Sequence, residues 1–393
     1  MSKVSRPSGT GTIVEVRSDV AALRPLVEDW EELAAEAAEP NPFYEHWMLL
    51  PAIEAFADAD FRCVLVWDNG KLAGLFPMRV QRRWRSLPIR ALRSWWHHNM
   101  VLCAPLIRAS SAARCVEALL KSKLAPLFEF ALVPAEGLFY GALAEAAAPL
   151  GCPWLVTDAY ARAILVRSRD PRNRFNSNLK NNLRRWESRL RACGALTPVR
   201  LSQGEDFAAW RDDFLRLEAS GWKGQAGSAL ALREPDRRFA VEVLEEAHRR
   251  GRLVITGLDL DGRPLARHIA ITAGEGAICF KIAYDETYAK HAPGIVAEVE
   301  NVRQFMESAG PRWEDSNTAR ENTSYGRVWK DRRTVQSVAI GTHGAGRAAV
   351  AVLPLLRLAK DLVRRLATRA PAADRDPGRL VPSAHPTVGL NPK

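Results

Sequence analysis

The chain has 393 residues, which is too long for one small domain and suits two domains with additional segments. Hydrophobic residues make up 47% of it, so each half has enough apolar side chains for a core of its own. The formal net charge is +11, and arginine is far more frequent than lysine. This charge either serves solubility alone or attracts an anionic partner, such as a phosphorylated cofactor, a nucleotide-linked sugar, tRNA or a lipid surface.

The six cysteines are scattered, and no two of them form a C-x-x-C pair. No histidine cluster accompanies them, and the adjacent pair His97-His98 has no evident third ligand. The pattern therefore predicts neither a metal site nor a disulfide framework, and it suits buried free thiols in a reducing cytoplasm. The N-terminal residues lack the apolar stretch of a signal peptide, and no run of about 18 apolar residues occurs. We therefore expect a cytoplasmic protein without a transmembrane helix.

In the first half, helical and strand patterns follow one another along the chain. Val20–Ala37 and Phe43–Phe56 show the helical spacing of apolar residues. The β-rich runs Arg62–Trp67 and Lys71–Val80 flank Asn69-Gly70, which is a strong hairpin signal because both residues tolerate positive φ. The rest of this half is predicted as strands at Thr12–Val16 and Arg90–Trp96, a helix-strand-helix unit over Ser110–Leu150 and short strands over Trp154–Val166.

A distinct basic segment, Arg172–Gly194, joins the two halves. Four of its apolar residues fall on one helical stripe, and Asn176 or Ser177 can cap the start of the helix. The other faces carry five basic residues: Lys180, Arg184, Arg185, Arg189 and Arg191. These residues form either the solvated faces of a connecting helix or an anion-binding wall over an active cleft.

The second half begins with helices at Asp206–Ala219 and Asp236–Arg250, separated by the loop Ser220–Ser228. Three β-rich runs with Gly-containing turns between them then predict an antiparallel meander: Arg252–Leu260, Leu265–Thr272 and Ala277–Tyr284. A helix at Ile295–Ser308 and short strands at Arg312–Ser316 and Thr334–Ile340 complete this half.

The two halves resemble each other, because Arg62–Phe76 and Arg252–Ile269 share a strand, an Asp/Gly turn and a second strand with Leu-Ala near its start. This repetition predicts an α+β fold of two tandem domains, each a mixed, mainly antiparallel sheet flanked by helices. The amphipathic helix near the C-terminus either lies on a membrane surface or docks on the domain. The expected segments are a flexible N-terminus (1–10), an N-terminal domain (11–170), the basic connecting helix (171–195), a C-terminal domain (196–342), the basic amphipathic helix (343–369) and a disordered tail (370–393).

The segment Tyr284–Val296 is the strongest candidate for a binding site. A strand ends there, Lys290 and His291 follow in a loop, and Pro293-Gly294 opens a helix. A helix N-terminus presents unpaired N–H groups and a partial positive charge, and glycine allows a ligand to come close to the backbone. The pattern indicates either an anion site or an ordinary helix start with proline in its first turn.

The order of three strands, a loop, a helix and a strand resembles the core of the GNAT superfamily. More closely, the C-terminal half resembles the CelD/BioF-like acetyltransferases, which are relatives of the FemABX peptidyltransferases. Three segments carry the resemblance: Glu218–Ala229, Tyr288–Gly294 and Trp313–Lys330. The sequence departs from the family pattern in two places: Ala292 replaces a serine before Pro-Gly, and Trp329-Lys330 replaces Tyr-Lys.

This resemblance implies an acyl-CoA site in the C-terminal half. The strand end at Ala283 and Tyr284 would lie beside the pantetheine arm and offer a backbone N–H to the thioester oxygen. The residues implied to bind the cofactor are Ala283, Tyr284, Tyr288, Lys290, His291, Pro293, Gly294, Ile295 and Val296.

The resemblance also implies three catalytic residues and an acceptor-binding wall. Asp315 would act as general base, Tyr325 would protonate the leaving thiolate, and Lys330 would stabilise developing negative charge. Trp222-Lys223 would contact the acceptor. Each residue also has a purely structural interpretation, since aspartates cap turns, tyrosine and tryptophan pack in cores, and lysines lie on surfaces.

The predicted function is acyl transfer from acetyl-CoA or another acyl-CoA to an amine or hydroxyl acceptor, by direct attack and without a metal. The resemblance suggests an amino sugar or exopolysaccharide precursor as acceptor. Two alternatives stay open. One is an aminoacyl-tRNA donor, as in FemABX proteins, although the coiled-coil insertion usual there is absent from this sequence; nucleic acid is expected as a partner only in this case. The other is a non-catalytic GNAT-like protein docked to the inner face of the membrane through residues 344–369.

Overall fold

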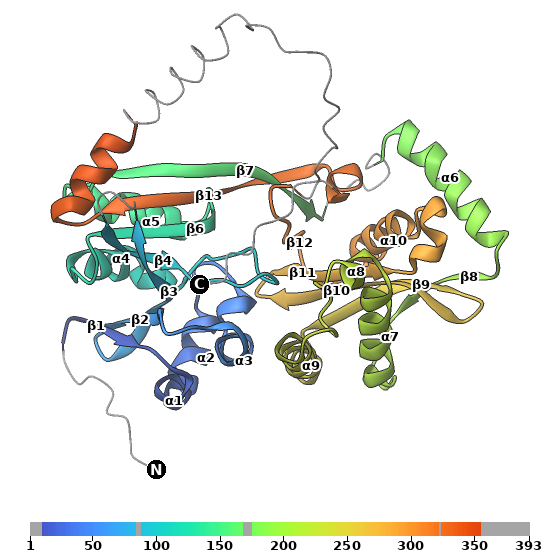
Figure 1. Ribbon diagram of the computed structural model, residues 1–393, viewed down its shortest axis with the longest axis horizontal. Helices are drawn as coiled ribbons and strands as arrows, with labels where there is room; N and C mark the ends of the chain where they lie inside the picture. The colour runs from blue at the N-terminus through green and yellow to red at the C-terminus, as the bar shows by residue number, and fades with distance from the viewer. Residues whose placement is uncertain (1–9, 84–87, 168–174, 322–323, 355–393) are drawn as a thin grey trace, which may run out of the picture. The chain divides into compact units, whose positions relative to one another are not determined.

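A computed structural model describes residues 10–83, 88–167, 175–321 and 324–354. The predictions for residues 1–9, for the start of the connecting segment (171–174), for residues 355–369 of the amphipathic helix and for the tail (370–393) lie outside the described residues. The described strands form one continuous mixed sheet with the order β1-β2-β3-β4-β6-β13-β7-β12-β11-β10-β9-β8, and β5 pairs with β3 (Figure 1). Among the described residues, no helix combines the length and apolar character needed to cross a bilayer.

The first half is built around the predicted hairpin. β2 (Phe61–Asp68) and β3 (Lys71–Arg83) pair antiparallel, and the turn between them has φ values of 49° at Asn69 and 76° at Gly70. These positive φ values confirm the turn that Asn-Gly predicts. The other elements of this half are β1 (Thr12–Arg17), α1 (Val20–Leu23), α2 (Val27–Ala35), α3 (His46–Phe56), β4 (Ile89–Ser94), β5 (Leu106–Ile107), α4 (Ala112–Lys121), β6 (Leu127–Pro134), α5 (Leu138–Ala147) and β7 (Trp154–Val166).

The predicted helix Val20–Ala37 is interrupted. The short 3₁₀ segment η1 (Arg24–Leu26) separates α1 from α2, and Pro25 lies at its start. Proline has no N–H to donate to the preceding turn, so the continuous α-helical hydrogen bonding is broken at this point.

The second half contains the predicted antiparallel meander. β9 (Leu253–Leu260), β10 (Arg263–Ala273) and β11 (Gly276–Tyr284) pair in sequence order, and β12 (Trp313–Asp315) adds in parallel to β11. The other elements are α6 (Ser177–Arg191), β8 (Leu196–Arg200), α7 (Phe207–Ser220), α8 (Trp222–Gln225), α9 (Glu234–Arg249), η5 (Glu286–His291), α10 (Pro293–Glu307), η6 (Ser324–Arg327) and β13 (Asp331–Gly341). Residues 344–354 are helical.

The duplication predicted from the sequence is visible in the order of pairing. In the first half, β2, β3 and β4 pair antiparallel, α4 follows, and β6 adds in parallel to β4. In the second half, β9, β10 and β11 are followed by α10, and β12 adds in parallel to β11. The fold is therefore α+β with two tandem GNAT-like halves.

The last strand joins the two halves into one sheet. β13 lies between β6 and β7 and pairs antiparallel with both. The far end of β7 pairs with β12, where Val166 lies opposite Trp313. Although β13 is the last of the described strands and lies within the predicted C-terminal segment (196–342), its hydrogen bonds go to strands of the first half.

A buried histidine marks a second junction between the halves. The ring of His97 stacks on Phe56 of α3 at 4.6 Å between centroids and meets the edge of Phe239 of α9 at 5.0 Å. His97 Nε2 has no hydrogen-bond partner among the described atoms. Burial lowers the pKa of His97 to about 3, because the charged imidazolium loses its hydration there.

This burial predicts a loss of stability in acid. Below pH 6.5 the unfolded chain protonates His97 while the folded chain does not, so the free energy of unfolding falls as the pH drops from about 6.5 towards about 3. His97→Phe is expected to make this fall shallower by up to about 1.4 kcal/mol per pH unit. Urea unfolding at several pH values measures the slope, with the exposed His248→Phe as control. An unchanged slope in His97→Phe contradicts the prediction.

Candidate functional site

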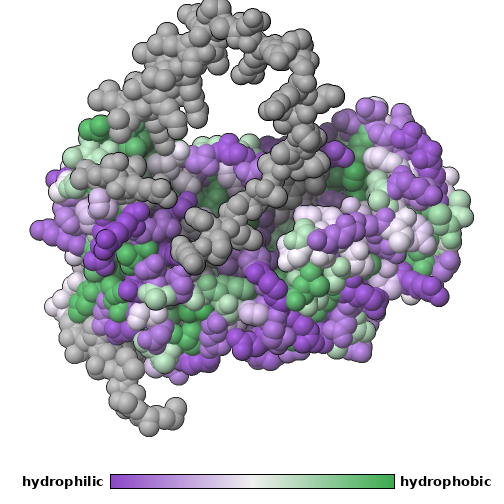
Figure 2. All heavy atoms as spheres, in the orientation of Figure 1, coloured by the Kyte–Doolittle hydropathy of each residue, from purple (hydrophilic) through white to green (hydrophobic). Residues whose placement is uncertain are grey.

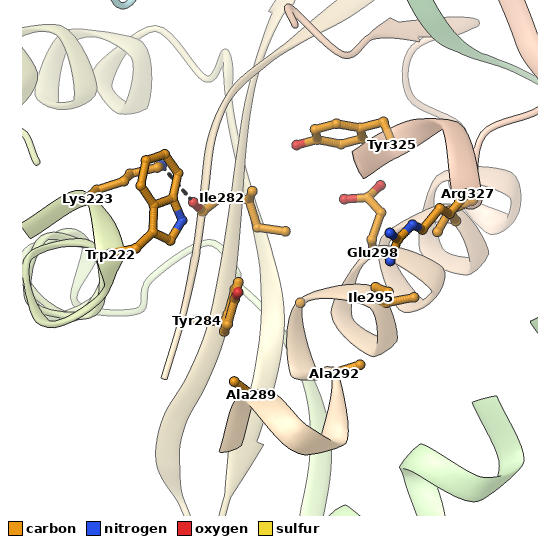
Figure 3. A pocket seen from close by; sticks show the side chains of 12 residues that line it. Trp222, Lys223, Ile282, Tyr284, Ala289, Ala292, Ile295, Glu298, Tyr325 and Arg327 are labelled. Atoms are coloured by element: carbon orange, nitrogen blue, oxygen red, sulfur yellow. Dashed lines mark hydrogen bonds between the residues drawn. The ribbon is translucent and has the colours of Figure 1, made fainter. Parts of the chain in front are cut away.

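A cavity of about 420 Å³ lies between the end of β11 and the beginning of α10. Trp222 and Lys223 of α8 approach it from one side, and the η6 segment with Tyr325 and Arg327 closes the other side (Figure 3). The twelve lining residues are Trp222, Lys223, Ile282, Tyr284, Ala289, Ala292, Gly294, Ile295, Glu298, Tyr325, Arg327 and Val328. The cavity therefore coincides with the segment that the sequence indicated as a binding site.

A β-bulge in β11 decides which side chains reach the cavity. Ile269 pairs with Lys281, but the next residue, Ala270, pairs with Cys279, so Phe280 is left without a partner. Beyond the bulge, Ile282 and Tyr284 face the cavity. Phe280 and Ala283 instead pack in the core on the opposite side of the sheet. The predicted role of Ala283 thus rests on its backbone alone.

The beginning of α10 comes close to β11. Ala292 adopts a left-handed conformation with φ 49° and ψ 49°, and Pro293 occupies the first turn of the helix. A Cβ atom on Gly294 would lie 2.8 Å from the Tyr284 ring, which is closer than side chains tolerate. Gly294 therefore allows the positive end of a 15-residue helix to meet the cavity wall, as an anion site requires.

The remaining residues implied to bind the cofactor do not line the cavity. Lys290 is exposed at the end of η5, and His291 is half-buried, with no partner for Nδ1 among the described atoms. Tyr288 and Val296 pack in the core between α10 and the sheet, and Pro293 is buried. Of the nine residues predicted for cofactor binding, Tyr284, Gly294 and Ile295 line the cavity.

The residues predicted to contact an acceptor both lie at the cavity. Trp222 is 57% exposed, and its backbone N–H donates to Glu286 Oε1 at 2.8 Å. Lys223 Nζ donates to the Ile282 carbonyl at 3.1 Å and to Glu218 Oε1 at 3.1 Å (Figure 3). Glu218 is buried, and Lys223 and Lys281 lower the pKa of its carboxyl against the opposing effect of burial. Trp222 is thus available for stacking, whereas Lys223 is held in place.

Glu298 is the only carboxylate among the lining residues. Its Oε1 accepts from Trp329 Nε1 at 2.6 Å, and its Oε2 lies 3.1 Å from His268 Nδ1. A carboxylate has about four lone-pair positions, so capacity remains for a proton from a bound molecule. Glu298 was not among the residues predicted from the sequence. The available signal was its position four residues after Gly294, which places both residues on one helical face.

Tyr325, implied by the resemblance to protonate the leaving thiolate, lines the cavity. Its hydroxyl lies 2.9 Å from Cys279 Sγ, and its ring meets Trp329 edge to face at 4.9 Å. Burial, followed by the neighbouring Cys279 and Glu298, raises the pKa of Tyr325 well above 10. The phenol is therefore protonated at neutral pH and can donate a proton.

Asp315 is not where the prediction placed it. Its side chain is fully buried and does not line the cavity; Arg162 Nη1 lies 3.4 Å from Oδ1, and Arg333 Nη1 lies 3.1 Å from Oδ2. The physical reason is that β7 continues the sheet beyond β12 and supplies Arg162 on the side where Asp315 points. Lys330 is exposed and is also absent from the cavity lining.

Glu314, the neighbour of Asp315, points to the opposite face of β12. Its Oε1 lies 2.7 Å from His268 Nε2 inside the domain. Burial disfavours a charged His268, but Cys279, Glu298 and Glu314 together outweigh that effect and raise the pKa of His268 well above 6.5. Glu314, His268 and Glu298 are thus connected by hydrogen bonds beneath the cavity.

The basic helix α6 begins as predicted, since Asn176 Oδ1 accepts the N–H of Leu179 at 2.8 Å. Leu183 and Leu190 are buried, and α6 packs against α10 and η5. The five basic residues named above are exposed, and Figure 2 shows mainly hydrophilic residues over this helix. None of them lines the cavity, so the basic face lies beside the site rather than within it.

Comparisons with known proteins give one family match and several similar folds. Residues 177–321 match the family model described as an acetyltransferase (GNAT) domain. Residues 177–321 are therefore similar to GNAT acetyltransferase domains. No curated protein sequence matches the chain.

Among solved structures, FemX aligns with a TM-score of 0.50 at 11% identity, covering 80% of this chain and 95% of FemX. A C-terminal domain of a putative lysylphosphatidylglycerol synthetase from Agrobacterium fabrum aligns with a TM-score of 0.49 at 13% identity. The alignment covers 83% of this chain and 94% of that domain. A tandem GNAT protein from the clavulanic acid biosynthesis pathway aligns with a TM-score of 0.40 at 15% identity. The alignment covers 85% of this chain and 100% of that protein. The likeness to FemX shows that the chain shares its fold.

The surroundings of Asp315 predict a structural role for this residue. Asp315→Ala leaves Arg162 buried without its counter-charge, and the free energy of unfolding is expected to fall by about 3–5 kcal/mol. Chemical denaturation measures this change. Asp158→Ala, which removes the exposed ion pair with Arg320, is expected to lower the free energy of unfolding far less. Equal losses in the two variants would contradict the structural role of Asp315.

Proposed function

We propose that this protein is an acyl-CoA-dependent acyltransferase that uses the cavity between β11 and α10. The observation that carries the proposal is the convergence of the β11 side chains Ile282 and Tyr284 with the α10 N-terminus at Gly294 and Ile295. A strand end suits the extended pantetheine arm, and the helix N-terminus suits a pyrophosphate. The GNAT domain match over the same residues supports this assignment.

In the proposed reaction, the acceptor amine or hydroxyl attacks the thioester carbonyl directly. A new bond forms to the carbonyl carbon, and the carbon–sulfur bond breaks to release CoA. Glu298 takes the proton from the acceptor, because it is the only carboxylate among the described residues that line the cavity. Tyr325, held protonated by its buried position, donates a proton to the leaving thiolate. Backbone N–H groups near the end of β11 stabilise the oxyanion.

The acceptor class follows from Trp222. An exposed tryptophan at the edge of the cavity suits stacking on a sugar ring. The resemblance to CelD/BioF-like proteins points in the same direction, towards an amino sugar or an exopolysaccharide precursor.

One observation favours a second candidate donor, an aminoacyl-tRNA. The exposed basic face of α6 lies beside the start of α10 and suits a phosphate backbone. Filter binding at several salt concentrations distinguishes the two donors. Tight tRNA binding with a steep salt dependence, together with no CoA binding, would replace acyl-CoA by tRNA in the proposal.

Blocking the mouth of the cavity is expected to weaken donor binding. Ala289 is exposed and lines the cavity, so Ala289→Trp fills the entrance without disturbing a core. Isothermal titration of acetyl-CoA should show binding to the unmodified chain and at least about tenfold weaker binding to this variant, a difference of about 1.4 kcal/mol. Ala208→Trp, at an exposed alanine outside the cavity, should bind normally. Unaltered binding by Ala289→Trp contradicts the assigned location.

Removing the proposed base is expected to lower the rate of transfer rather than donor binding. Glu298→Gln keeps the shape of the side chain, and kcat should fall by a factor of about 100 or more. Release of the CoA thiol is measured with a panel of amines and amino sugars. Glu300→Gln, two residues along α10 and outside the cavity lining, is the matched control. A Glu298→Gln variant with the kcat of the unmodified chain removes Glu298 from the mechanism.

A further inference from the structure

Behind the cavity wall, three side chains from adjacent strands converge on one point. His268 of β10, Cys279 of β11 and Glu314 of β12 each offer a ligand atom, and these atoms lie within 4.8 Å of one another. The exposed fractions of the three residues are 0%, 2% and 3%. We propose that these three side chains form a binding site for Zn²⁺.

The bulge at Phe280 builds this cluster. Strand alternation alone would direct Cys279 to the face opposite Ile282. The unpaired Phe280 shifts the register, so Cys279 shares a face and a core with the cavity wall. Bulges often redirect a side chain next to a functional site.

The donor set selects the metal. A thiolate, an imidazole and a carboxylate are the ligands that zinc uses, whereas Mg²⁺ and Ca²⁺ prefer oxygen atoms alone. Three protein ligands leave the fourth tetrahedral position open. Tyr325 lies beside the cluster, because its hydroxyl lies 2.9 Å from Cys279 Sγ, and it also lines the cavity.

The surroundings of His268 have the arrangement of a zinc-binding histidine. Glu298 Oε2 lies 3.1 Å from His268 Nδ1. The other ring nitrogen, Nε2, points to Glu314 Oε1 at 2.7 Å. A carboxylate on the second nitrogen fixes the tautomer and orientation of a metal-binding imidazole. Trp329 and Asn301 in turn donate to Glu298 Oε1 at 2.6 and 3.3 Å, so the supporting carboxylate is itself held in place.

Charge also suits a divalent cation. Two buried carboxylates, Glu298 and Glu314, face the single imidazole of His268. A divalent cation that displaces the thiol proton of Cys279 and the proton between His268 and Glu314 leaves the total charge of the cluster unchanged. The buried carboxylates thus keep a positive partner, which they require in a low-dielectric interior.

The sequence predicted no metal site. It could not reveal this one, because the three ligands are far apart in the sequence and follow no short motif. It does not depend on the proposed transfer reaction. Zinc would connect β10, β11 and β12 directly beneath the cavity and hold Glu298 through His268.

The test uses the full chain without an affinity tag. After removal of bound metal, Co²⁺ is titrated and the thiolate-to-cobalt charge-transfer absorption is recorded, and zinc content is measured by mass spectrometry. One equivalent of metal is expected, and Zn²⁺ should displace Co²⁺. Cys279→Ser should lose the absorption, and Glu314→Gln should bind at least about tenfold more weakly. Cys193→Ser, which alters an exposed cysteine, should behave as the unmodified chain does.

The proposal is overturned if the unmodified chain is folded but shows no thiolate-to-cobalt absorption. The three side chains then form a hydrogen-bonded cluster without a metal. Absorption that persists in Cys279→Ser also overturns it, because the metal is then bound elsewhere. If Cys279→Ser does not fold, Glu314→Gln provides the test. An unchanged affinity of Glu314→Gln for Co²⁺ excludes the site. Acetyl-CoA binding, measured separately, tests the proposed function and not the metal site.

Discussion

The register shift at Phe280 is the constraint on which the candidate site depends. It places Cys279, Ile282 and Tyr284 on the face that meets α10, and it sends Phe280 and Ala283 into the opposite core. A regular strand would have put Cys279 among the residues of the other core. One unpaired residue therefore determines both the wall of the cavity and the polar cluster behind it.

The short strand β12 carries two buried carboxylates that point to opposite faces of the sheet and have different partners. On one face, Asp315 balances Arg162 and Arg333 where the two halves of the sheet meet. On the other face, Glu314 joins His268 and Glu298 beneath the cavity. Adjacent residues with the same charge thus serve different purposes, because strand geometry directs them to different environments.

The sequence predicted the features that depend on local chemistry. The Asn69-Gly70 hairpin, the meander from Arg252 to Tyr284 and the helix start at Pro293-Gly294 all follow from the preferences of neighbouring residues. The duplicated fold followed from the repetition of such features. Five of the six cysteines are buried, and all six are free thiols, as expected.

The residues that the sequence misplaced depend on distant partners. Asp315 was predicted as the general base because it ends a short strand, but its environment is decided by β7, whose pairing the local sequence does not reveal. The bulge at Phe280 has no local signature such as glycine, so the convergence of His268 with Cys279 and Glu314 was also hidden. Long-range pairing, rather than local preference, decided the site.

The position of β13 has a consequence for how the chain is made. The gap between β6 and β7 is filled only by residues 331–341, which leave the ribosome long after both neighbours. Until then each neighbour has an unpaired edge, and such edges promote aggregation. The N-terminal half therefore cannot complete its sheet until residues 331–341 have been made, and a chain that stops before residue 331 lacks the strand that closes both halves into one sheet.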